Sequence, residues 1–102
     1  MIQKQQLICN AINEKKVIRF TYKGTIREVE PFLLGILEST DNLVLSGYKI
    51  SGFSESNNAI PWRLYNLIDI TTLTLTDKDA KPSRLGYNKR DERFSKIICK
   101  RQ

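Results

Sequence analysis

The side chains of this sequence that suggest chemistry are basic and aromatic. Arg27 and Arg63 carry planar guanidinium groups whose donors match the oxygens of a phosphate or a carboxylate. Tyr48 and Trp62 carry flat rings on which a nucleobase can stack, a contact worth about 1–3 kcal/mol per base. The alternatives are an arginine paired with a neighbouring acid and a lone tryptophan buried in the core. Both interpretations stay open from the sequence.

A polar loop and a basic tail add further candidates. The loop, residues 51–58, has the sequence SGFSESNN, and its hydroxyls and amides could surround an anion. Such a loop is also commonly a plain solvated connection. Basic side chains and one tyrosine follow in the tail, a mixture that suits a nucleic-acid backbone. The predicted ligand-binding residues are Arg27, Tyr48, Lys49, Ser54, Trp62, Arg63 and Tyr87.

Catalysis has little support in the sequence. The chain contains no histidine, the commonest general base and metal ligand. Two cysteines are too few for a zinc site, and no glycine-rich segment ends in the glycine–lysine–serine of a phosphate loop. Glu28 and Glu30 share one strand face, where neighbouring bases favour ion pairing. We therefore predict a protein that is not an enzyme and has no cofactor and no metal.

The cysteines and the apolar runs suggest where the chain works. Cys9 and Cys99 lie near opposite ends, and we expect both to be reduced and half-buried, with a disulfide between the ends as the alternative. No run approaches the roughly 20 apolar residues that cross a membrane. The apolar run near the N-terminus is too short for a signal peptide. We expect one domain, residues 1–102, in the cytoplasm and with no membrane contact.

The charge is unevenly distributed. The chain carries 17 Lys and Arg against 11 Asp and Glu, a net charge of +6. Residues 1–28 and 77–102 are basic, whereas residues 29–76 are acidic overall. If the two ends converge in the fold, they would form a positive surface that attracts phosphates or an acidic partner. The alternative is that this charge only keeps a small domain dispersed in water.

The elements that must position these residues follow from the hydrophobic periodicity. Apolar residues at helical spacing predict a helix over 2–14. Alternation with a period of two then predicts strands over 17–76, beginning at Val17, with a tight turn at Lys23-Gly24 and either a strand end or an edge position at Pro31. A second strand from Thr25 to Glu30, a third from Phe32 to Leu37, a fourth from Leu43 to Ile50 and a strand over 70–76 complete this part.

The last segment differs from the rest. Residues 77–83 are expected to form a charged linker, and residues 77–102 a basic tail that wraps over the sheet and ends in a short strand or helix. The fold class is therefore mainly β with an N-terminal α-helix. One helix followed by about five short strands predicts a small, strongly bent sheet or barrel.

The order of these motifs resembles the WYL domain family. The opening helix is followed by IRFTYKGTIREVEP (18–31), which resembles the start of a WYL domain, and WRLYNLIDITTL (62–73) resembles the family's later aromatic–arginine–leucine strand. The naming triplet is replaced by Leu43, Val44 and Leu45. Tyr65 and Asn66 stand where an aspartate–arginine pair is usual, so two binding residues of regulator-linked members are missing.

The chain is more similar to the short stand-alone branch of that family. Gly47-Tyr48-Lys49, Ser51-Gly52-Phe53-Ser54, Trp62-Arg63 and Gly86-Tyr87 match motifs that recur there, and the resemblance runs from about Leu7 to Ile98. It implies an SH3-like or Sm-like β-barrel. It also implies a bacterial or phage sensor of nucleic acid or nucleotide-like ligands that tunes transcription or phage defence. No helix-turn-helix is expected in this chain.

Two functions follow as hypotheses. The first is a non-catalytic ligand-binding module for single-stranded nucleic acid or a nucleotide-like anion. Arg27 and Arg63 would hold phosphate in it, while Tyr48 and Trp62 would stack on bases. The alternative is a domain for protein interaction or self-association as a homodimer, without a nucleic-acid ligand, because exposed strand edges invite pairing.

Overall fold

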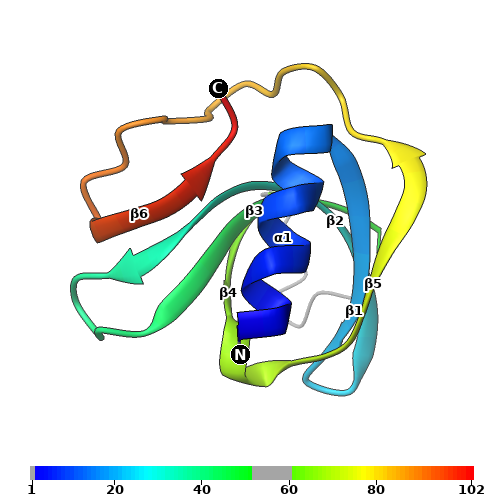
Figure 1. Cartoon of the computed structure of the whole chain (residues 1–102), viewed down its shortest axis with the longest axis horizontal. Helices are drawn as coiled ribbons and strands as arrows, with labels where there is room; N and C mark the ends of the chain where they lie inside the picture. The colour runs from blue at the N-terminus through cyan, green and yellow to red at the C-terminus, as the bar shows by residue number, and fades with distance from the viewer. Residues whose placement is uncertain (1, 52–60) are drawn as a thin grey trace.

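The computed structural model describes residues 2–51 and 61–102, and these form one helix, one short 3-10 helix and six strands (Figure 1). In chain order the elements are α1 (Ile2–Glu14), β1 (Lys16–Tyr22), β2 (Thr25–Leu37), β3 (Leu43–Ser51), β4 (Trp62–Asn66), η1 (Leu67–Asp69), β5 (Ile70–Asp79) and β6 (Phe94–Lys100). The fold is therefore mainly β with an N-terminal helix, as predicted.

The strands form one antiparallel sheet that bends around α1. Its order is β4-β3-β2-β1-β5, and β6 pairs with β2 outside this path. β2 joins the whole sheet, because its first half pairs with β1 and its second half with β6, while β3 lies along its other edge. No pairing between β4 and β5 is present among the described residues, so the sheet is bent and open.

The first half of the chain agrees closely with the prediction. The helix over 2–14 is confirmed, and β1 buries Ile18, Phe20 and Tyr22 while Arg19 stays exposed. Lys23 and Gly24 both have positive φ, at 51° and 80°, as a tight two-residue hairpin turn requires. The period of two therefore located this hairpin correctly.

Two predicted strand boundaries are wrong. Pro31 does not end a strand, because β2 continues through it to Leu37. The register of β2 against β3 shifts between Pro31 and Leu33, and such an irregularity accommodates a residue that cannot donate a hydrogen bond. The charged segment 77–83 is also not all linker, since β5 extends to Asp79, where Lys16 pairs with the Asp79 carboxylate at 2.6 Å.

The two faces of the sheet have different coverings. We call the side that packs on α1 the helix face, and there Ile8 and Ile12 of α1 meet Phe20, Leu45 and Tyr65 of the strands. We call the other side the tail face, because residues of the chain after β5 contact Trp62 and Phe32 there before the chain returns as β6. A smaller cluster of Leu33, Val44 and Phe94 lies on that side. The tail thus wraps over the sheet and ends in a strand.

The cysteine prediction is wrong, because Cys9 of α1 and Cys99 of β6 form a disulfide. Their Cα atoms lie 5.8 Å apart although 90 residues separate them in sequence. The two ends of the chain therefore converge, which spacing alone did not indicate. No helix in the described part of the chain is long and apolar enough to cross a bilayer. The described residues also contain no cluster of histidine, cysteine and acidic side chains fit to hold a metal.

Candidate functional site

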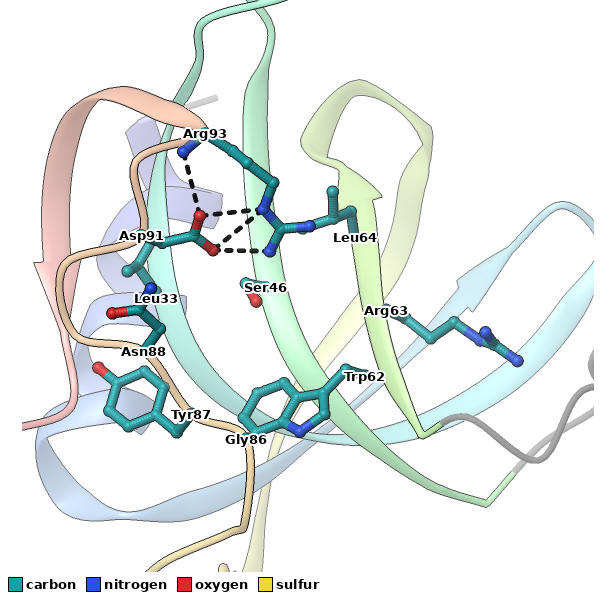
Figure 2. A pocket seen from close by; sticks show the side chains of 10 residues that line it. All are labelled: Leu33, Ser46, Trp62, Arg63, Leu64, Gly86, Tyr87, Asn88, Asp91 and Arg93. Carbon is teal, nitrogen blue, oxygen red and sulfur yellow. Dashed lines mark hydrogen bonds and ion pairs between the residues drawn. The ribbon is translucent and has the colours of Figure 1, made fainter.

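The sheet separates the predicted aromatic residues from the predicted basic ones. Successive side chains of a strand point to opposite faces, so Trp62 and Arg63 of β4 cannot share a face. The same holds for Tyr48 and Lys49 of β3, where Tyr48 lies opposite Trp62 in register. Figure 2 shows the ring of Trp62 beside Tyr87 and the side chain of Arg63 pointing the other way.

The basic residues come together on the helix face. Lys49 lies opposite Val29 of β2, and Arg63 lies opposite Gly47 of β3. By this register Lys49 is a diagonal neighbour of both Arg27 and Arg63, a spacing that long side chains easily bridge. We call these three residues the basic cluster. Arg27 is buried in it, and Lys49 and Arg63 are half-buried.

The charges of the basic cluster act on one another. Burial, then the charge of Arg63 and then that of Arg27 lower the pKa of the Lys49 ammonium. No acidic side chain of the described residues adds an opposing effect on Lys49. An anion placed among these groups would relieve the repulsion, so the cluster has the electrostatic character of an anion site.

Arg27 is the deepest member of the cluster, with only 7% of the residue exposed. Its Nε donates to Thr25 Oγ1 at 3.0 Å, its Nη2 donates to the Tyr22 carbonyl at 3.3 Å, and its guanidinium lies 5.5 Å from the centre of the Tyr22 ring. These contacts fix the orientation of the guanidinium.

Tyr65 lies beneath the basic cluster and was not among the predicted site residues. It follows Arg63 by two positions in β4 and therefore shares its face, and its ring packs edge-on against Phe20 and Tyr22, with 5.0 Å between centroids in each pair. Its hydroxyl is buried and makes no hydrogen bond with the described residues. Burial raises the pKa of Tyr65, although Arg27 and Arg63 partly oppose this effect.

The aromatic side chains predicted to stack on a ligand contact one another on the tail face. The Trp62 ring meets Phe32 at 5.0 Å and Tyr48 at 5.5 Å, and lies nearly parallel to Tyr87 at 6.1 Å between centroids. The Arg84 guanidinium lies 4.0 Å from the centre of the Tyr48 ring. Each predicted stacking ring therefore already contacts the protein's own side chains.

Hydrogen bonds hold the tail against these rings. Trp62 Nε1 donates to the Leu85 carbonyl at 2.9 Å, and the Tyr87 hydroxyl donates to the Arg101 carbonyl at 2.6 Å. Gly86 lies between these contacts with φ of 94°, and a Cβ there would lie 2.9 Å from Trp62 Nε1. The glycine–tyrosine motif of the tail thus has a packing role in this structure.

The tail also carries its own counter-charges. Glu30, 2% exposed, accepts hydrogen bonds from Arg84 Nε at 2.7 Å, from Arg84 Nη2 at 2.8 Å and from the Lys81 amide at 3.1 Å. Burial alone would raise the pKa of Glu30, but these bonds and the charges of Arg84 and Arg101 lower it overall. Glu28 likewise pairs with Arg19 and Lys78. The predicted ion pairing of both glutamates is present, and it neutralises part of the basic excess.

A pocket of about 370 Å³ opens between the tail and the tail face (Figure 2). Leu33, Ser46 and Leu64 of the sheet line it together with Tyr87 and an ion pair in which Arg93 Nη2 lies 2.6 Å from Asp91 Oδ2. The hydrogen bonds with Arg93 lower the pKa of Asp91, so its carboxylate stays ionised and paired. Arg63 also borders this pocket, but its side chain points away from Trp62 and Tyr87, so the charges nearest those rings are the paired Asp91 and Arg93.

Alternation along the strands could have revealed this division from the sequence. Once 62–66 is taken as a strand, Arg63 and Tyr65 must share a face that excludes Trp62. Of the predicted loop, only Ser51 is described, and its hydroxyl donates to Glu28 Oε1 at 3.2 Å. Ser54 lies outside the described residues. The structure therefore brings together Arg27, Lys49 and Arg63, and separately Tyr48, Trp62 and Tyr87.

Comparison with known proteins gives no relative from which a role could be transferred: no family model, no curated protein and no solved structure matches the chain. The chemistry of the described residues is therefore the ground on which a function can be argued.

Proposed function

We propose that this protein is a non-catalytic binding module for phosphate-bearing ligands, and that the basic cluster holds the phosphate. The observation that carries the proposal is the convergence of three cationic side chains at diagonal positions of β2, β3 and β4. Like charges on neighbouring strands destabilise a sheet. An anion placed beside Lys49 would interact favourably with all three cations, which is the electrostatic ground of the proposal.

The ligand would be a nucleotide or a nucleic-acid strand held mainly by its phosphate. Trp62 and Tyr48 cannot stack on a base whose phosphate sits in the basic cluster, because the sheet lies between them. Affinity therefore depends on charge and hydrogen bonding, and it should fall with salt. With three cations at the site, the log–log slope against salt should be about −2 or shallower for a single strand.

A titration with matched variants tests the proposal. The probe is a short oligodeoxythymidylate with a 5′ phosphate and a 3′ fluorophore, and its anisotropy is followed as protein is added. Lys49→Gln and Arg63→Gln should each weaken binding by about tenfold or more. Lys96→Gln removes the same charge from an exposed position of β6 and should leave binding nearly unchanged.

The other outcomes have clear meanings. Equal losses in Lys49→Gln and Lys96→Gln would contradict a defined site and leave only diffuse attraction. A dimer that resists salt, in a protein with no affinity for any phosphate-bearing probe, would favour the alternative function in protein interaction or self-association.

Three further proposals come from the sequence alone. Membership of the WYL family, an SH3-like or Sm-like barrel and a role in transcriptional regulation or phage defence rest on the motifs described above. The cytoplasmic location also stays a prediction. The Cys9–Cys99 disulfide weighs against it, because such bonds persist mainly in oxidising compartments.

A further inference from the structure

The pocket between the tail and the tail face is large enough for a small molecule. Its volume of about 370 Å³ lies within the roughly 300–1,000 Å³ of small-molecule sites. The buried residues Leu33 and Ser46 line it from the sheet, and residues of the tail line it from the other side. The sheet lies between this pocket and the side chains of Arg27 and Lys49 on the helix face. A ligand in the pocket would therefore not depend on the basic cluster.

Two aromatic rings form one wall of the pocket. The rings of Trp62 and Tyr87 are inclined by only 16° to each other, with 6.1 Å between centroids, and Figure 2 shows them side by side. Their polar atoms already donate to backbone carbonyls of the tail and of the chain end. Trp62 and Tyr87 therefore offer the pocket mainly the carbon surface of their rings.

Phe32 and Gly86 keep these rings in place and accessible. Phe32 contacts both rings, with 5.0 Å to the Trp62 centroid and 4.8 Å to the Tyr87 centroid. At Gly86 a Cβ would lie 2.9 Å from Trp62 Nε1 and 3.5 Å from Cδ1, so a side chain there would press on the indole. Trp62 and Tyr87 are each half-buried, and each keeps part of its surface exposed.

Hydrogen-bonding groups line the rest of the pocket. Ser46 is 8% exposed, and its hydroxyl makes no hydrogen bond with the described residues. Asp91 and Arg93 form a bidentate ion pair, with Nε 2.9 Å from Oδ1 and Nη2 2.6 Å from Oδ2. Asn88 adds a side-chain amide. Because Ser46 comes from the sheet and the other three from the tail, a ligand would meet polar groups on more than one side (Figure 2).

This combination suits an uncharged ring with hydroxyl groups around its rim. One face of a pyranose sugar presents mainly C–H groups, which pack on an aromatic ring as other apolar surface does. Its hydroxyls both donate and accept hydrogen bonds, so they match a carboxylate, a guanidinium and a serine hydroxyl alike. Asp91 and Arg93 neutralise each other beside the rings, so the charge there does not require a charged ligand.

We propose that this pocket binds a sugar ring, which stacks on Trp62 and Tyr87. Ser46, Asp91 and Arg93 hydrogen-bond the hydroxyls of the sugar. The inference goes beyond the proposed function, because it concerns the other face of the sheet and an uncharged ligand. Binding of such a ligand releases no counterions and is therefore independent of salt.

The emission of Trp62 reports binding directly, because Trp62 is the single tryptophan. The probes are the methyl glycosides of glucose, galactose, mannose and N-acetylglucosamine, and adenosine is the flat, uncharged comparison. At least one glycoside should change the emission saturably, with a dissociation constant on the order of 1 mM. That constant should be the same at low and at high salt.

Two variants separate recognition from folding, which urea unfolding monitors. Ser46→Ala removes a hydroxyl with no partner among the described residues, so it should fold as well as the wild type and weaken glycoside binding about threefold or more. Asp91→Asn keeps the shape of the side chain but removes its charge, and should weaken binding about fivefold or more. Ser83→Ala makes the same change as Ser46→Ala at an exposed position and should bind like the wild type, as should Lys49→Gln.

The opposite results would overturn the proposal. An emission that no glycoside changes would do so, and so would a response to adenosine alone, which would indicate a site for a nucleobase. Equal glycoside binding in Ser46→Ala, Asp91→Asn and Ser83→Ala would place the sugar outside this pocket. None of these results bears on the phosphate site, which the oligonucleotide titration tests separately.

Discussion

Lys49 lies diagonal to two arginines, so folding brings three positive charges together on one face of the sheet. Like charges on neighbouring strands oppose one another, and under the proposed function a bound anion offsets this repulsion. At this scale the sequence could indicate which residues are basic, but not that Arg27 would be buried against Tyr22. The contact with Tyr22 follows from the β1–β2 register, but the burial of Arg27 also needs packing between segments distant in sequence, which periodicity does not encode.

The first prediction concerns Lys49. Without a ligand, Lys49→Gln should raise the free energy of unfolding by up to about 0.5 kcal/mol, because repulsion from Arg27 and Arg63 is relieved. Urea unfolding in chloride at low ionic strength measures this. With phosphate at about 20 times the wild type's dissociation constant, the wild type should become the more stable protein, because it gains more binding free energy than the weaker-binding variant. The exposed Lys96→Gln should change neither measurement.

The second prediction concerns Glu30 and pH. Its pKa is lower in the folded protein than its ordinary value of 4.5, so its ion pair stabilises the fold above that value. The stabilisation is lost as pH falls through the lower, folded pKa. Glu30→Gln should therefore cost about 2 kcal/mol at pH 7 and progressively less below pH 4.5.

Unfolding curves at pH 7, 5 and 3 follow that difference. Glu92→Gln is the control, because Glu92 is exposed and its charge change is the same. A cost of Glu30→Gln that stays constant down to pH 3 would contradict the assigned pKa direction.

At the scale of elements, alternation predicted the helix and the first hairpin well. It predicted less well where the chain makes long-range pairings, at Pro31, at the end of β5 and in β6. The segment 77–102 has few apolar residues, and its strand exists because β2 offers an unpaired edge beside Leu33 to Leu37. Tertiary context of that kind is not visible in a local window.

The third prediction concerns the link between α1 and β6. The Cys9–Cys99 disulfide closes a sequence separation of 90 residues, and the chain-entropy model gives about 4–5 kcal/mol for a loop of this length. Reduction by a thiol, or the pair Cys9→Ser and Cys99→Ser, should lower the free energy of unfolding by up to that amount. Coincident urea curves with and without reductant would contradict a stabilising bond.

The fourth prediction concerns the docking of the tail. Gly86→Ala introduces both a strained positive φ, costing about 1 kcal/mol, and a methyl group against the Trp62 indole. Trp62 is the single tryptophan, so its emission should shift to longer wavelength as the tail loosens. Gly24→Ala is the matched control, because its φ is also positive but nothing lies near its Cβ. It should lose similar stability without the spectral change, and equal spectra for both variants would contradict the packing role of Gly86.

At the scale of the whole molecule, the net charge of +6 conceals an uneven distribution. The tail holds many basic residues, yet Arg84 and Arg93 are paired with Glu30 and Asp91. The basic cluster contains both basic side chains of the otherwise acidic segment 29–76, and at Lys49 burial and the charges of Arg63 and Arg27 lower the pKa with no opposing effect from an acid of the described residues. The distribution of charge along the sequence suggested a positive surface formed by the two ends of the chain. In the fold, the basic cluster instead lies on β2, β3 and β4.

The central claim is that a phosphate binds among Arg27, Lys49 and Arg63 on the helix face. Two-dimensional ¹H–¹⁵N spectra, including the arginine Nε region, locate binding directly when inorganic phosphate replaces chloride at constant ionic strength. The account predicts saturable shifts at the Nε signals of Arg27 and Arg63 and at the Lys49 and Tyr65 amides, with Arg84 and Arg93 unmoved. Shifts confined to Arg93 and Trp62 on the tail face, or weak shifts spread over every basic residue, would contradict it.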